Sequence, residues 1–195
     1  MKKLLLLAAL GFFAVRADLL LKPTEVDPAS WLAPRAPKLE GEYAPNAVLK
    51  NIQRLAAGIG RGPEGIGIDA EGRIVTGFDD GRIIRLSADG SRYEELANTG
   101  GRPLGISFAA DGAPIVADSR KGLLRIEGGK AIPMVTEANG TAVGFADDVD
   151  VAGTMAIFSD ASTKYTDQFS LRILPEPRPH GRLVAHDSAT GTSTD

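Results

Sequence analysis

The chain has 195 residues, of which 43% are hydrophobic and 24% are charged, a balance typical of a folded globular protein. Its 22 basic and 25 acidic side chains give a net charge of −3, which disfavours nucleic acid and anionic membrane surfaces as partners of the whole molecule. The absence of cysteine excludes disulfides, thiolate metal sites and a cysteine nucleophile. A polyanionic partner is therefore not expected.

The first 17 residues have the pattern of a targeting segment. Lys2 and Lys3 precede an apolar run at residues 4–15, and small residues flank Arg16 at the spacing that a signal peptidase recognises. As a helix this run would be about 18 Å long, shorter than the ~30 Å hydrocarbon core of a bilayer. We expect residues 1–17 to be a cleaved signal peptide or an N-terminal anchor. Either would make the protein secreted, periplasmic or membrane-anchored on the extracytoplasmic side, and a cytosolic amphipathic start is the less favoured alternative.

Residues 18–61 are expected to form an extended, proline-rich wrap or linker. Prolines recur at positions 23, 28, 34, 37 and 45, which forbids a long helix there. For residues 46–55 the periodicity does not distinguish a short strand from a short helix.

Beyond residue 61 the sequence repeats. The segment Gly62–Gly72 resembles Arg102–Gly112, and a third copy covers Ala146–Gly153. The glycines that end these copies, at positions 72, 112 and 153, lie 40 and 41 residues apart, which is the length of one four-stranded propeller blade.

Each copy is followed by two strand-like segments with a period of two, joined by turn residues typical of antiparallel hairpins. These segments are residues 74–77 and 81–86, 114–117 and 122–126, and 154–159 and 181–186. The repeat predicts an all-β fold, a β-propeller with about three blades in residues 62–195. An antiparallel sandwich with accidental spacing is the alternative. The third copy is longer, with an insertion between Tyr165 and Gly181 that we expect at one end of the propeller, where loops shape pockets.

Several short motifs resemble one known family. They are Gly-Pro-Glu at 62–64, Arg-Pro-Leu-Gly at 102–105, Ala-Asp-Ser at 117–119, Ser-Asp-Ala-Ser-Thr-Lys-Tyr at 159–165 and Gly-Arg-Leu-Val-Ala-His-Asp at 181–187. They resemble the strictosidine synthase-like family, which includes adipocyte plasma membrane-associated proteins and is related to gluconolactonases and paraoxonases. The resemblance implies a six-bladed propeller of which this sequence supplies only the N-terminal blades, so we expect an incomplete, truncated ring.

The resemblance also implies a metal site. In metal-dependent relatives a divalent ion lies at one mouth of the central channel, held by a Glu of the first blade and by Asn or Asp of later blades. Glu64 matches that Glu, and Asp147 lies where the family usually has Asn. Asp148 either ligates the ion or braces a neighbouring ligand. The alternative for Glu64 is that it is simply an acidic residue of a surface turn. Hard oxygen ligands suit Ca²⁺, the expected cofactor.

No catalytic residue is identified. Leu104 lies where the resemblance to paraoxonases would place a general-base His, so proton abstraction by that route is excluded. Asp118 and Asp160 recur one blade apart, which favours a structural role in bonding backbone at strand ends. His180 and His186 are expected at the surface.

The resemblance implies a metal-dependent hydrolase of lactones or aryl esters when all blades are present, and therefore a small-molecule substrate as the partner. The alternatives are a non-catalytic, membrane-anchored propeller that binds a ligand or partner, and a condensing enzyme of the strictosidine synthase type. The three blades alone are expected to be inactive and of low stability, because an open ring leaves apolar blade faces in water.

Overall fold

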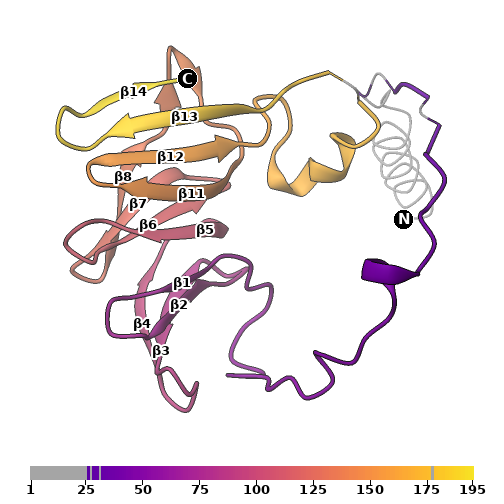
Figure 1. Cartoon of the computed structure of the whole chain (residues 1–195). Coiled ribbons are helices and arrows are strands. Elements are labelled where there is room, and N and C mark those ends of the chain that lie inside the picture. Colours follow the sequence, from indigo (N-terminus) through magenta and orange to yellow (C-terminus); the bar gives the residue numbers. More distant parts are fainter. Residues whose placement is uncertain (1–25, 27, 31, 177) are drawn as a thin grey trace, which may run out of the picture.

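The computed structural model describes residues 26, 28–30, 32–176 and 178–195, so the targeting segment predicted at residues 1–17 lies outside the described part. The described chain is built almost entirely of antiparallel strands (Figure 1). The strands are β1 (Ile66–Ile68), β2 (Ile74–Gly77), β3 (Arg82–Leu86), β4 (Tyr93–Asn98), β5 (Pro103–Phe108), β6 (Pro114–Asp118), β7 (Gly122–Glu127), β8 (Lys130–Val135), β9 (Glu137–Ala138), β10 (Thr141–Ala142), β11 (Ala146–Ala152), β12 (Met155–Asp160), β13 (Arg182–Asp187) and β14 (Thr192–Thr194).

Each sequence repeat folds into one four-stranded sheet with its strands in chain order: β1–β4 form blade 1, β5–β8 form blade 2 and β11–β14 form blade 3. Strands β9 and β10 make a small separate hairpin between blades 2 and 3. The glycine that ends each repeat lies in the turn after the first strand and has a positive φ: +76° at Gly72, +83° at Gly112 and +62° at Gly153. Residues with a Cβ rarely adopt this conformation, which explains why glycine recurs at this spacing. The predicted blades are confirmed.

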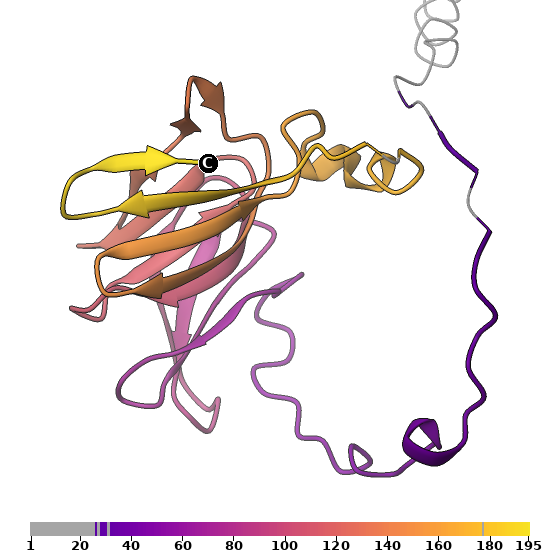
Figure 2. The same cartoon turned by 45° about the horizontal axis from the view of Figure 1, so that its top comes forward.

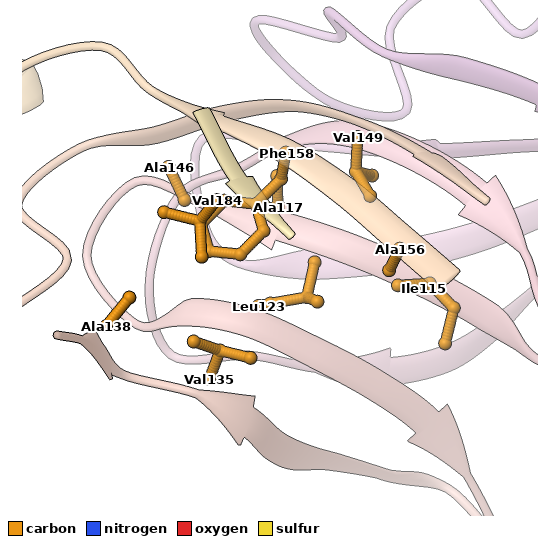
Figure 3. Close-up of a cluster of buried hydrophobic side chains, with 10 residues drawn as sticks. All are labelled: Ile115, Ala117, Leu123, Val135, Ala138, Ala146, Val149, Ala156, Phe158 and Val184. Carbon is orange, nitrogen blue, oxygen red and sulfur yellow. The ribbon is translucent and has the colours of Figure 1, made fainter. Parts of the chain in front are cut away.

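The three blades follow one another in an arc that does not close into a ring (Figure 2). Their first strands lie side by side, with β5 in contact with both β1 and β11. One apolar cluster lies between blades 1 and 2 and includes Val75, Ile83 and Leu124. A second lies between blades 2 and 3, where Phe158 and Val184 pack towards Ile115 and Leu123 (Figure 3). Sheet-on-sheet packing of side chains that alternate along each strand forms this core.

The alternation that fills the core also leaves apolar side chains on the two outer faces of the arc. In blade 1, Ile66 and Ile68 are 65% and 58% exposed. In blade 3, Ile157 and Leu183 are 50% and 66% exposed, although their neighbours Phe158 and Val184 are buried.

Asp118 and Asp160 are fully buried at the ends of β6 and β12 and bind backbone, as predicted. Asp160 accepts hydrogen bonds from the amides of Gly144 (3.1 Å) and Phe145 (2.8 Å), and its other oxygen lies 3.0 Å from Nε of Arg182. Asp118 accepts from the amides of Arg102 and Arg120, both at 2.9 Å. These carboxylates therefore tie the segment that enters each blade to the middle strands of the same blade.

The insertion after β12 is anchored by a buried acid. Glu176 lies 2.7 Å from Nζ of Lys164 and 3.1 Å from Nε2 of His180, and it accepts a hydrogen bond from the Tyr165 hydroxyl. The lysine and the tyrosine hydroxyl lower the pKa of Glu176 to about 2. Within the insertion a 3₁₀ helix, η2 (Asp167–Arg172), is joined to blade 2 by Arg120, whose guanidinium lies 2.7 Å from Asp167.

The insertion lies on the face of the propeller at which the first strand of each blade begins. Asp160 is the last residue of β12 before the insertion, and it pairs with Ala146 at the start of β11 and with Arg182 at the start of β13. In Figure 1 the insertion projects sideways from β12 and β13. The expectation that it stands at one end of the propeller is confirmed.

The described part of residues 26–61 forms a wide loop that stands away from the blades over most of its length and contains one short 3₁₀ helix, η1 (Gly41–Tyr43) (Figure 2). Residues 46–55 form neither of the two alternatives, a strand or a helix, but include a turn. Among the described residues no helix is long and apolar enough to cross a membrane.

Replacing Asp160 by Ala should lower the free energy of unfolding by about 3 kcal/mol, because it leaves the amides of Gly144 and Phe145 and the Nε of Arg182 without their acceptor. Asp118→Ala should destabilise less, by about 2 kcal/mol, because one oxygen of Asp118 has no partner to lose. Urea unfolding of both variants measures the two values. Equal or reversed losses would contradict the different roles assigned to the two carboxylates.

Candidate functional site

The predicted metal ligands lie at the start of the first strands of the blades. Glu64 precedes β1, and Asp147 and Asp148 follow the first residue of β11. Leu104 holds the corresponding place in β5. The regular pairing register is interrupted near the start of β5, between Pro103 and Gly105, and near the start of β11, between Ala146 and Val149. Such bulges turn side chains away from the regular ladder and concentrate them at the end of the sheet.

The structure brings all three predicted acids to one cavity. A cavity of about 300 Å³ is lined by Glu64, Gly65, Leu104, Gly105, Asp147 and Asp148. Its walls come from three blades, because β5 lies between β1 and β11. Residues that are distant in the sequence therefore meet around one opening, on the propeller face that also carries the insertion.

Close backbone contacts make this convergence possible. The Gly65 amide donates to the Leu104 carbonyl (2.7 Å), which joins blade 1 to blade 2. A Cβ atom at Gly105 would lie only 2.6 Å from the Cα atom of Asp148, closer than real Cβ contacts allow. Glycine at position 105 thus permits the approach of β5 to β11 that sets Leu104 beside Asp147.

The charges of the cavity repel one another. The pKa of Asp147 is raised first by burial and then by the negative charges of Glu64 and Asp148. Asp148 is held by local hydrogen bonds: its amide donates to the Ser159 hydroxyl (3.0 Å), and its carboxylate accepts from the Val149 amide (2.9 Å). A positive side chain also lies beside the cavity: the Nη2 of Arg102 is 3.8 Å from Glu64.

The carboxylates of the cavity are of the chemical type that binds a hard divalent cation, but they are too few to complete its coordination. Carboxylate oxygens are the ligands that Ca²⁺ prefers, and it takes six to eight of them. In the part of the chain that the structure describes, no three His, Cys, Asp or Glu side chains converge closely enough to form a metal cluster by themselves. Glu64, Asp147 and Asp148 therefore suit part of a ligand set, which water or further oxygens would have to complete.

Sequence reasoning missed the contribution of Arg102, which it treated only as part of a motif. Arg102 donates to the Gly62 carbonyl (2.7 Å) and lies 3.1 Å from Asp79, so it joins blade 2 to the turn that carries Glu64. No local pattern reveals this role, because its partners lie many residues away along the chain.

The two histidines lie outside the cavity. The predicted surface position of His186 is wrong: this residue of β13 is 6% exposed, and its Nδ1 lies 2.9 Å from the Ser193 hydroxyl. Burial lowers the pKa of His186, which favours the neutral ring in the core. His180 belongs to the cluster around Glu176.

The raised pKa of Asp147 predicts a pH-dependent effect. A carboxyl whose pKa is higher in the folded than in the unfolded chain favours folding below its unfolded pKa and opposes it once pH exceeds the folded pKa. Asp147→Asn, measured with chelator present, should therefore raise the melting temperature at pH 7 more than at pH 3. Glu137→Gln, an exposed acid on β9, serves as the control and should show little difference between the two pH values. Equal responses of the two variants would contradict the raised pKa of Asp147.

Comparison with known proteins agrees with the fold and the motifs. A family model described as strictosidine synthase-like, N-terminal, matches residues 41–86. Strictosidine synthase-like protein 6 of Arabidopsis thaliana is 43% identical over 151 residues, covering 73% of this chain and 40% of the relative. The human adipocyte plasma membrane-associated protein is 30% identical over 192 residues, covering 88% of this chain and 45% of the relative. The chain thus spans less than half the length of either protein.

The fold has solved counterparts as well. A gluconolactonase from Xanthomonas campestris superposes with a TM-score of 0.56 at 18% identity, covering 69% of this chain and 47% of that chain. At this identity the likeness concerns the propeller fold alone. By its motifs, its relatives and its fold together, the chain belongs to the family of strictosidine synthase-like and adipocyte plasma membrane-associated proteins and corresponds to the N-terminal part of their propeller.

Proposed function

We propose that this chain contributes part of the cation site of an extracytoplasmic propeller enzyme that hydrolyses lactones or aryl esters with the help of Ca²⁺. One observation carries the proposal: Glu64, Asp147 and Asp148 line a single cavity although they come from two different blades. Burial and then the negative charges of Glu64 and Asp148 raise the pKa of Asp147, and a divalent cation would relieve that repulsion.

Each lining residue then has a distinct role. Glu64 and Asp147 bind the cation directly, while Asp148, fixed by Ser159 and by the Val149 amide, braces Asp147 or adds a further oxygen. Leu104 lines the cavity but is only 6% exposed, and as a side chain without a titratable group it cannot remove a proton. A bound cation of this kind polarises an ester carbonyl or lowers the pKa of water.

The proposed location follows from two observations of different kinds. The pattern of Lys2, Lys3 and the apolar run at residues 4–15 is typical of an exported or anchored protein. The mammalian relatives are named for their association with the plasma membrane. We therefore propose that the blades face the extracytoplasmic side, secreted or held at a membrane by the N-terminus.

A non-catalytic binding propeller is the second candidate, and Leu104 favours it. Without a titratable group at this place, the bases that the cavity lining offers are the carboxylates of Glu64, Asp147 and Asp148, which the proposal assigns to the cation. Such a site also suits a structural cation that shapes a ligand-binding surface. A condensing enzyme is the third candidate and would require an acid outside this chain.

Removing the proposed ligand should remove calcium stabilisation. At a calcium concentration 100 times the dissociation constant, binding to the folded state alone stabilises it by about 2.7 kcal/mol. Glu64→Gln, which keeps the size of the side chain and removes its charge, should abolish most of that increase. Thermal melts with calcium and with chelator measure it, and Glu71→Gln in the β1–β2 turn is the matched control. An equal calcium shift in wild type and Glu64→Gln would exclude Glu64 from the site.

Activity distinguishes the candidates. The full-length gene product should hydrolyse members of a lactone and aryl ester panel, and chelator should remove that hydrolysis. Hydrolysis that survives chelator would reject the metal-dependent mechanism. Calcium binding without hydrolysis would instead support the non-catalytic propeller.

A further inference from the structure

We propose that Arg102 is the positioning residue of the cation site, because it fixes the turn that carries Glu64. This inference rests on the function proposed above. The Arg102 side chain is only 16% exposed and reaches from the start of blade 2 across to blade 1. Its Nη1 donates to the Gly62 carbonyl (2.7 Å) and lies 3.1 Å from Asp79, and its Nη2 lies 3.8 Å from Glu64.

Arg102 is held firmly at its own backbone. Its amide donates to Asp118 (2.9 Å), and its carbonyl accepts from the Ser119 amide (2.9 Å). Asp118 is 0% and Ser119 2% exposed, so both partners belong to the interior of blade 2. The guanidinium therefore extends from a rigid base, and a planar group with several fixed donors is well suited to bridging two segments.

The turn that it contacts is exposed and is fixed at its two ends by backbone bonds. The Asp79 amide donates to the Arg61 carbonyl (3.0 Å), and the Gly65 amide donates to the Leu104 carbonyl (2.7 Å). Between these points the bond from Arg102 to Gly62 holds the middle of the turn. Glu64 itself is 60% exposed, so its direction depends on the turn more than on packing.

Two effects of Arg102 on a cation oppose each other. Its positive charge repels a cation, whereas its hold on the turn keeps Glu64 directed towards the cavity shared with Asp147. The contact with Glu64 is long at 3.8 Å and the carboxylate is exposed, so water screens the charge effect strongly. The bond to Gly62 is short, so the positioning effect dominates. Removal of Arg102 should therefore weaken calcium binding.

The experiment compares Arg102→Ala with Arg120→Ala in the full chain by calcium titration. Arg120 lies at the same end of blade 2 and its removal deletes the same charge, but its guanidinium binds Asp167 of the insertion. We expect Arg102→Ala to weaken calcium affinity about tenfold or more, as losses of supporting residues around metal ligands do. Arg120→Ala should leave the affinity unchanged or slightly increased. An unchanged or tighter calcium affinity in Arg102→Ala would overturn the proposal.

A second measurement, made without metal, separates this inference from the proposed function. Hydrogen exchange at the Gly65 amide should become faster in Arg102→Ala, since the turn loses its central anchor next to the bond from Gly65 to Leu104. The Phe145 amide, bonded to Asp160 in blade 3, should keep its protection and thereby report an intact fold. A wild-type chain that binds no calcium would refute the proposed cation site. Unchanged Gly65 exchange would refute the positioning role, whatever the outcome of the titration.

Discussion

The close packing of the first strands of successive blades is the constraint on which the rest of this structure depends. Blade 1 bonds to blade 2 where the Gly65 amide meets the Leu104 carbonyl at 2.7 Å. Blade 2 approaches blade 3 where Gly105 leaves no room for a side chain against Asp148. The apolar clusters between the sheets then supply most of the stabilisation, because they remove alternating side chains from water. The acidic cavity is a consequence of the same packing, since it lies where these strands begin.

The carboxylates of Asp160 and Asp147 have different roles in this fold, and their surroundings distinguish them. Asp160 receives two amide hydrogen bonds and a guanidinium, so its charge is satisfied and it stabilises the blade. Asp147 is half-buried and lies near the charges of Glu64 and Asp148, which together raise its pKa, so its charge opposes folding at neutral pH. A residue that opposes folding is expected where binding rather than stability has shaped the sequence. The contrast supports an external cation for Asp147 and none for Asp160.

The repeat made most of the fold predictable from the sequence. The turn glycines at 72, 112 and 153 mark positions of positive φ that few other residues tolerate, so their spacing gave the blades and the strands between them. The grouping of Glu64 with Asp147 came from the family resemblance, because no local pattern relates residues so far apart. The role of Arg102 and the burial of His186 were not predictable, since both depend on contacts between segments that only the folded chain brings together.

The insertion of blade 3 lies on the same propeller face as the cavity but lines no part of it among the described residues. It begins where the first strands of the blades begin. The buried acid Glu176, which bonds to Lys164 and Tyr165, fixes its base. The pair between Asp167 and Arg120 ties it also to blade 2. Because Asp118 bonds the amides of both Arg102 and Arg120, the anchor of the Glu64 turn and the anchor of the insertion share one buried carboxylate. A substitution at Asp118 is thus expected to disturb both the turn that carries Glu64 and the attachment of the insertion to blade 2, because Asp118 supports the backbone of both arginines.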